Sequence, residues 1–183
     1  MQTLRAQNET GLSELKTKVH AITEGCSKPY FYKALERMIE TNPANCNTIC
    51  EYILAEQREI NLKDSTKEGK IKVLIWLSAF LGGKLFPHAT KQDILSYLDS
   101  LRKPQWEDSS RKWIGSYNSR QMILNKFFRW LYNPDEYDQK RRITPPCMTG
   151  VRKLPRGQSS PYKPSDLELN RGLGHDILFI RCS

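Results

Sequence analysis

Apolar residues recur every three or four positions through the middle of the chain, which is the spacing of one face of an α-helix. Residues 42–133 show no useful length of period-two alternation, the pattern expected of a half-buried strand. The chain therefore predicts four helices joined by short loops. Their apolar faces are Ile49 and Ile53; Ile71, Leu74, Ile75 and Leu81; Ile94, Tyr97, Leu98 and Leu101; Trp113, Tyr117, Leu124, Phe127, Phe128 and Leu131.

Helix starts are marked by capping residues, whose side chains accept hydrogen bonds from the first free backbone N–H groups. Gly82-Gly83 and Pro134 are expected to end two of the helices, because glycine and proline interrupt helical geometry. The predicted caps are Asn42 followed by Pro43, Ser65 with Glu68, Thr90 with Asp93, and Ser109 or Ser110.

These elements predict an all-α protein in which residues 42–134 form a compact four-helix domain of about 90 residues. The 183-residue length allows one such domain with arms on both sides. Residues 1–41 are expected to be a partly helical N-terminal extension, with a helix over residues 29–40 and a shorter one near residues 12–22. The rest of the chain, residues 135–183, is basic and rich in proline, which predicts an extended linker.

Positive charge is concentrated after residue 62. Residues 1–62 carry 7 Lys/Arg and 8 Asp/Glu, whereas residues 63–165 carry 20 Lys/Arg and 9 Asp/Glu; the whole chain has a net charge of +9. Residues 139–165 hold seven Lys/Arg and no acidic residue. Such segregation favours a polyanionic partner, above all double-stranded DNA, over the alternative of a merely solubilising surface.

Two predicted helices and the linker supply the candidate DNA contacts. Lys67 and Lys70 are three residues apart near a helix start, where free N–H groups also attract phosphate. Asn and Arg side chains on the last helix are types that read bases in a major groove. The alternative is that these are the solvated faces of amphipathic helices. The candidate residues are Ser65, Thr66, Lys67, Lys70, Arg111, Lys112, Asn118, Arg120, Arg141, Arg142, Arg152, Lys153 and Arg156.

Other kinds of site have little support. The aromatic residues of the helices are expected in the core, with stacking on bases as the alternative. Cys46 and Cys50 are interpreted as packing residues rather than metal ligands, because a closed zinc site needs four ligands. No catalytic motif, cofactor, small-molecule substrate, secretory signal or membrane span is predicted; the longest apolar run, residues 73–81, is too short to cross a bilayer. We expect a cytoplasmic, nucleoid-associated protein.

The stretch "STKEGKIKVLIWLSAFLGGKLFPHATKQDILSYLDSLRK", followed by "RKWIGSYNSRQMILNKFFRWLYNP", resembles the N-terminal core-binding domain of tyrosine recombinases, the phage-type integrases. With "PYKPSDL" in the linker, the resemblance covers residues 42–167 and is strongest to archaeal integrase-like proteins. It implies a SAM-like helical bundle that forms half of a clamp around duplex DNA. It further implies that Thr66, Lys67 and Lys70 meet phosphates, with Lys112, Asn118 and Arg120 near the groove.

In that family a second domain performs DNA integration and recombination with a Tyr nucleophile and a His-x-x-Arg motif. None of His20, His88 and His175 is followed by Arg three positions later. The sequence after residue 167 departs from the family pattern, so we expect a truncated integrase that binds DNA and is not an enzyme. Two alternatives remain: a helical interaction module that modulates full-length recombinase protomers, and an inactive remnant.

Overall fold

The computed structural model describes residues 2–104, 106–108 and 111–155, and all the regular structure in these ranges is helical. The all-α prediction is thus confirmed for the described residues. The helices are α1 (Gln2–Thr23), α2 (Tyr30–Thr41), α3 (Pro43–Ile60), α4 (Asp64–Phe80), α5 (Lys91–Asp99) and α6 (Trp113–Tyr132), with short 3-10 turns η1 (Phe86–His88) and η2 (Pro146–Met148).

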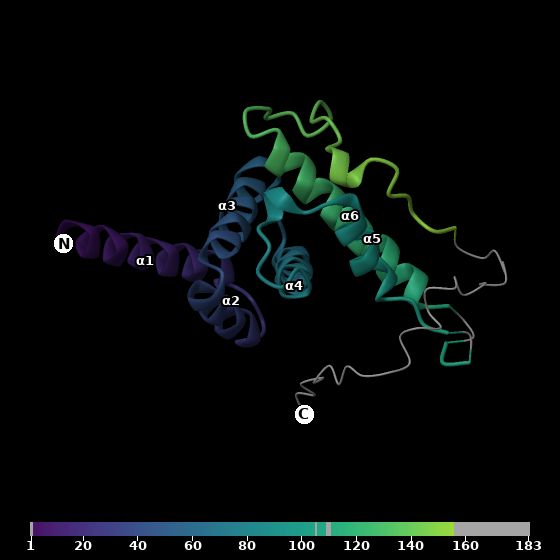
Figure 1. The fold of residues 1–183 in the computed structure, drawn as a ribbon, viewed down its shortest axis with the longest axis horizontal. Coiled ribbons are helices and arrows are strands. Elements are labelled where there is room, and N and C mark those ends of the chain that lie inside the picture. The colour runs from purple at the N-terminus through teal and green to yellow at the C-terminus, as the bar shows by residue number, and fades with distance from the viewer. Residues whose placement is uncertain (1, 105, 109–110, 156–183) are drawn as a thin grey trace.

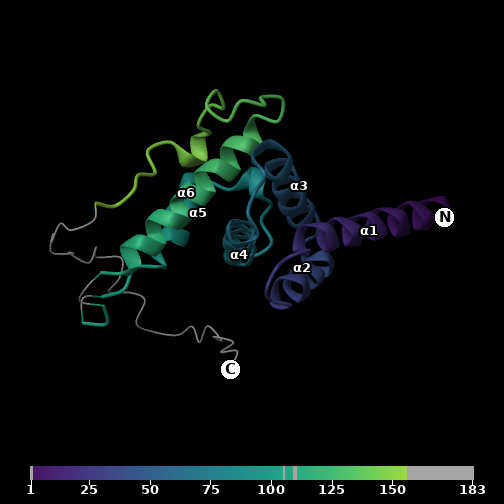
Figure 2. The same cartoon turned by 180° about the vertical axis from the view of Figure 1, so that it is seen from behind.

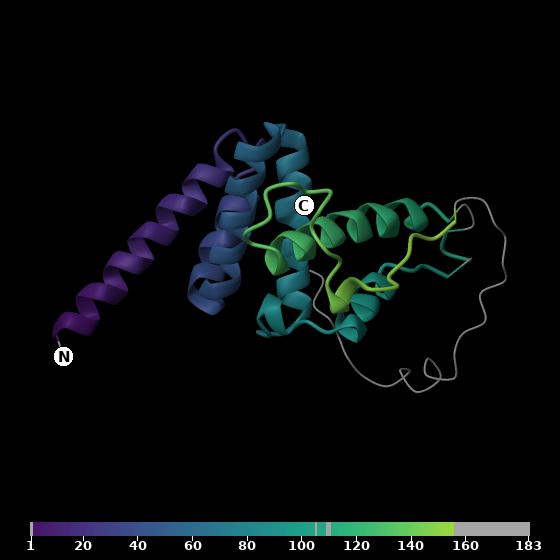
Figure 3. The ribbon, with the colours of Figure 1, turned by 90° about the horizontal axis from the view of Figure 1, so that it is seen from above.

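α4 lies at the centre of the molecule. Figure 1 shows it nearly end-on, with α1, α2 and α3 on one side and α5 and α6 on the other, and Figure 2 shows the same arrangement from behind. α4 contacts α2, α3 and α6, so its buried side chains join the two halves. The N-terminal half of α1 runs away from the rest of the molecule (Figures 1 and 3).

Two of the predicted helix starts are confirmed. The side chain of Asn42 accepts a hydrogen bond from the backbone N–H of Asn45, and Pro43 is the first residue of α3. Thr90 and Asp93 form a reciprocal capping box at the start of α5. Both motifs are complete within four residues, which is why local sequence was enough to identify them.

The other two predicted starts differ from the structure. α4 begins at Asp64, with Lys63 rather than Ser65 as its N-cap, so the predicted capping box is wrong. Glu68, its proposed partner, instead accepts a 2.5 Å hydrogen bond from the backbone N–H of Ser27. α6 begins at Trp113; the predicted caps Ser109 and Ser110 lie outside the described residues.

The N-terminal extension is more helical than predicted. The short helix expected near residues 12–22 is part of α1, which is 22 residues long. Leu15, Val19 and Ile22 of α1 are buried, and α1 contacts both α2 and α3. The second half of α1 therefore belongs to the same hydrophobic core as the predicted four-helix domain.

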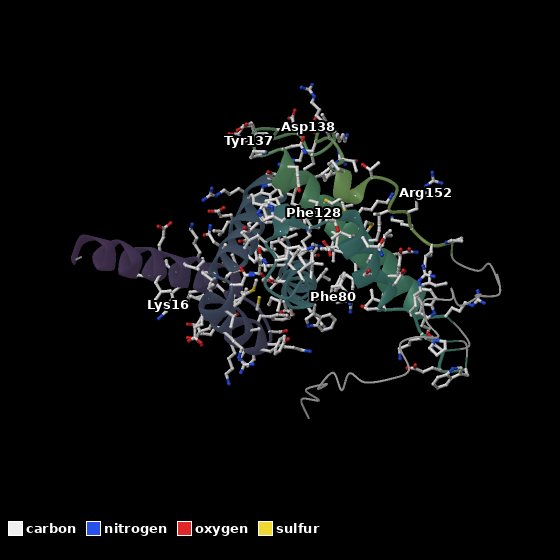
Figure 4. The ribbon with its side chains drawn as sticks, viewed as in Figure 1. Lys16, Phe80, Phe128, Tyr137, Asp138 and Arg152 are labelled. Atoms are coloured by element: carbon white, nitrogen blue, oxygen red, sulfur yellow. The ribbon has the colours of Figure 1, made fainter. Side chains whose placement is uncertain are left out.

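Aromatic rings fill the centre of this core. Phe127 is fully buried and packs edge-to-face against Tyr52, Phe86 and Phe128, with ring centroids 5.0–5.2 Å apart. Figure 4 shows Phe128 in the interior of the molecule. The core assignment is therefore confirmed for these rings. Trp76, Trp113 and Trp130 are partly buried and pack against the core, and Cys46 and Cys50 are fully buried within it.

The chain after α6 packs back onto the helices. η2 contacts α5 and α6, and Cys147, Met148 and Val151 are buried. Residues 145–155, which we call the strap, are thus part of the folded core rather than a free linker. Among the described residues, no helix combines the length and hydrophobicity needed to cross a membrane.

Candidate nucleic-acid interface

Lys67 faces inward. Its side chain is only 2% exposed, and its ammonium donates a 2.5 Å hydrogen bond to the backbone carbonyl of Glu24 and lies 2.9 Å from the carboxylate of Asp64. These contacts fasten the turn after α1 to the first turn of α4. The amine is therefore engaged inside the protein and does not face a phosphate.

Lys70 is also internal. Its ammonium forms an ion pair with Glu56, a residue of α3 that is itself 1% exposed and accepts a 3.0 Å hydrogen bond from the hydroxyl of Tyr52. Burial, with repulsion from Lys126, lowers the pKa of Lys70 to about 8, so the amine is still mostly protonated at pH 7. The pair links α3 to α4 across the core.

Asn118 holds the strap. Its side-chain amide donates to the carbonyl of Leu154 at 2.8 Å, and its side-chain oxygen accepts from the N–H of Leu154 at 2.7 Å. Gln121, one turn later on α6, donates to the carbonyl of Val151 at 2.9 Å. With both ends of its amide engaged, Asn118 is not placed to read a base.

Arg142 anchors the loop between α6 and the strap. Its side chain is 5% exposed and pairs with Glu59 of α3 at 2.7 Å, while Arg129 of α6 donates to its backbone carbonyl. The neighbouring Arg141 points outward, with its side chain 77% exposed and 3.6 Å from Asp138. Figure 4 shows Tyr137 and Asp138 on this same outer loop.

The remaining candidates lie nearer the surface. Ser65 and Thr66 are exposed in the first turn of α4, and Lys112 is exposed at the start of α6 beside the half-buried Arg111. Arg120 is half-buried on α6. Arg152 projects outward from the strap (Figure 4), and Lys153 is exposed beside it; Arg156 lies outside the described residues.

The exposed Lys72 on α4 was missed by the sequence analysis; the exposed Lys126 belongs to the basic residues of the last predicted helix but was left out of the candidate list. A signal for Lys72 was present. Lys67 and Lys70 lie seven residues before Leu74 and Leu77, and therefore on the apolar stripe of α4, whereas Lys72 falls on the opposite face.

Four cations lie on or beside α6, in two groups that come from α4, α6 and the strap. Lys126 stands on α6 one turn after Met122, whose sulfur is 3.2 Å from the ammonium of Lys153 on the strap. At the other edge, Arg120 of α6 and Lys72 of α4 both lie over the ring of Trp76. We call Lys72, Arg120, Lys126 and Lys153 the α4–α6 face.

The positive charges of the α4–α6 face have no acidic partner among the described residues. None of its four cations forms an ion pair with a carboxylate of the described residues, whereas Lys67, Lys70 and Arg142 all do. The same part of the chain contains no cluster of three or more His, Cys, Asp or Glu side chains suited to a metal ion. The surface can therefore attract an anion, above all one with several phosphates.

Comparison of the chain with protein-family models, with curated proteins and with solved structures finds no match.

Proposed function

We propose that this protein binds double-stranded DNA through the α4–α6 face. The observation that carries the proposal is a set of four cations that come from two helices and the strap and have no carboxylate partner among the described residues. They are the exposed Lys72, Lys126 and Lys153 and the half-buried Arg120. A duplex presents regularly spaced phosphates that such a surface can neutralise.

The resemblance to the core-binding domain of tyrosine recombinases supports the choice of the same two helices. In that family the second and fourth helices of the bundle lie against DNA, and the corresponding elements here are α4 and α6. The proposal is that α3 to α6 form a SAM-like bundle of this kind. Exposed Ser65, Thr66 and Lys112 stay in the proposed site, whereas Lys67, Lys70, Asn118 and Arg142 leave it because their polar groups are engaged internally.

The contacts proposed are mainly to the DNA backbone. Amide side chains that discriminate bases need both their donor and acceptor free, and those of Asn118 and Gln121 hold the strap. Lysine reaches phosphate as a flexible point charge and supplies little base discrimination. We therefore expect unrelated duplexes to compete within a few-fold of one another.

The test is fluorescence anisotropy with a labelled duplex of about 30 base pairs at 50 mM salt. Replacing Lys126 and Lys153 by Glu should weaken binding at least about tenfold, because two phosphate contacts become repulsive. Lys16→Glu is the control, since Lys16 is exposed on α1, away from α6 (Figure 4). No binding by the parent chain, or an equal loss in the Lys16 variant, would contradict the proposal.

A further inference from the structure

Trp76 is contacted by two cations from different helices. The ammonium of Lys72, one turn earlier on α4, is 4.5 Å from the centroid of the Trp76 ring. The guanidinium of Arg120, on α6, is also 4.5 Å from the same centroid. Cations are attracted to the negative face of an indole ring at this distance, so the ring fixes where both charges stand.

Arg120 is held from a third helix as well. It donates a 3.4 Å hydrogen bond to the hydroxyl of Tyr97 on α5 and lies 5.8 Å from the centre of that ring. Tyr97 is buried and in turn packs edge-to-face against Phe80 of α4, with centroids 5.5 Å apart. The guanidinium therefore loses little further freedom on binding a ligand, and it keeps several of its five N–H donors for it.

The two charges lie within about 9 Å of each other, and neither is balanced by a carboxylate of the described residues. Because each is 4.5 Å from one point, they are no more than about 9 Å apart, roughly the Debye length at physiological salt. Their repulsion is thus only partly screened, and no carboxylate of the described residues pairs with either one. An anion that contacts both would relieve this repulsion.

We propose that Lys72 and Arg120 form a phosphate-binding site for which Trp76 is the positioning residue. The phosphate oxygens accept hydrogen bonds from the ammonium of Lys72 and from the guanidinium of Arg120. A phosphate suits this pair better than a carboxylate, because its oxygens point in several directions and the two donors arrive from different helices. That the phosphate is a DNA phosphodiester rests on the proposed function; free phosphate is the other source of the same chemistry.

Replacing Trp76 distinguishes binding at this site from attraction that depends only on the number of charges. Trp76→Leu removes the ring but no charge, so duplex affinity should fall about three- to tenfold through the loss of two cation–π contacts. The slope of log affinity against log salt should not change, because the number of cations is the same. Trp76→Phe keeps an aromatic face and should recover part of the loss.

Because Trp76 packs against the core, thermal unfolding of Trp76→Leu must be measured alongside binding. The double variant Lys72→Ala/Arg120→Ala leaves the Trp76 side chain in place and keeps the proposal testable if Trp76→Leu does not fold. Its salt slope should be shallower by about one, since the one phosphate that both residues bind is lost. An unchanged slope in this variant would overturn the site.

The source of the phosphate is tested by following the indole N–H resonance of Trp76 by NMR, assigned from its absence in Trp76→Phe. A shift with duplex and a milder one with inorganic phosphate support the proposal. A shift with inorganic phosphate alone keeps the site but removes the DNA function. If the duplex binds tightly without shifting the Trp76 resonance, and Trp76→Leu binds it with unchanged affinity, the DNA function stands but the phosphate site at Lys72 and Arg120 is overturned.

Discussion

The lysines of α4 and α6 have different roles, because some of their side chains face the core and others face solvent. Lys67 and Lys70 are buried and paired, whereas Lys72 and Lys126 are exposed. A charge that leaves water must be compensated by a partner, and each buried lysine has an acidic one, Asp64 or Glu56. The exposed lysines have no such constraint and are available to a ligand.

The buried pair of Glu56 and Lys70 gives a stability prediction. Glu56→Gln should lower the free energy of unfolding by about 3–5 kcal/mol, because it leaves the Lys70 charge buried without its counter-charge. Replacing Glu56 by Leu and Lys70 by Met together should restore much of the loss. Urea unfolding at pH 7 measures both variants.

Glu51→Gln is the matched control for this prediction. Glu51 is on the same helix but half-exposed, with its ion pair to Lys18 at 3.4 Å, so its loss should cost less than about 1 kcal/mol. If Glu56→Gln were no more destabilising than Glu51→Gln, the buried pair would have no special role in stability.

Asp93 makes the free energy of unfolding depend on pH below about 4. Hydrogen bonds from Lys84 and from Thr90 lower its pKa from 3.8 to about 2. A carboxyl whose pKa is lower in the folded state stabilises the fold fully above pH 4, and this contribution is lost as the pH falls towards 2. Asp93→Asn should therefore cost about 1 kcal/mol at pH 7 and almost nothing at pH 2.

Urea unfolding of the parent chain and of Asp93→Asn at pH 7, 4 and 2 checks this dependence. The side chain of Asp93 is 25% exposed, so solvent limits the effect to the modest size given above. A difference between the two proteins that stayed constant down to pH 2 would show that the carboxylate charge is not what stabilises the start of α5.

The helices show which parts of the fold follow from local sequence. Asn42-Pro43 and the Thr90–Asp93 pair define helix starts because their hydrogen bonds close within the motif. The predicted cap at Ser65 failed because Glu68 bonds to Ser27, 41 residues earlier in the chain. Such a distant partner has no local signature, so sequence spacing alone could not reveal it.

The strap is the element least visible in the sequence. Its prolines and cations predict an extended linker, and it does lack long helices, but Asn118 and Gln121 bind its backbone to α6. An asparagine that was read as a candidate DNA contact is therefore a structural residue. Only the fold shows that the N–H and carbonyl of Leu154 come within reach of Asn118.

Asn118→Ala should loosen the strap. It leaves the N–H and carbonyl of Leu154 without their partner, which should cost about 1–3 kcal/mol and speed amide exchange at residues 151–154. Hydrogen–deuterium exchange measures the effect, with Asn125→Ala on the same helix as the control. Unchanged protection of Leu154 in Asn118→Ala would contradict the role assigned to this amide.

Taken as a whole, the chain shows that charge distribution predicts more than individual residues do. The excess of Lys/Arg after residue 62 indicated a basic surface, and α4, α6 and the strap each carry an exposed lysine without a carboxylate partner among the described residues. Which lysines form that surface depends on helix phase and tertiary pairing. Lys67 and Lys70 fall on the apolar stripe with Leu74 and Leu77, which indicates that their side chains are buried. The position of a basic residue near a helix start does not carry this information.

The central claim is that the four cations of the α4–α6 face, and not the buried lysines, bind the DNA backbone. The most direct test is the salt dependence of duplex affinity between 50 and 200 mM for the parent chain and for a variant with Lys72, Arg120, Lys126 and Lys153 all replaced by Ala. Three phosphate contacts, one of them shared by Lys72 and Arg120, predict a log–log slope of about −3 for the parent and a markedly shallower slope for the variant. Equal slopes, or no binding by the parent at 50 mM, would contradict the claim.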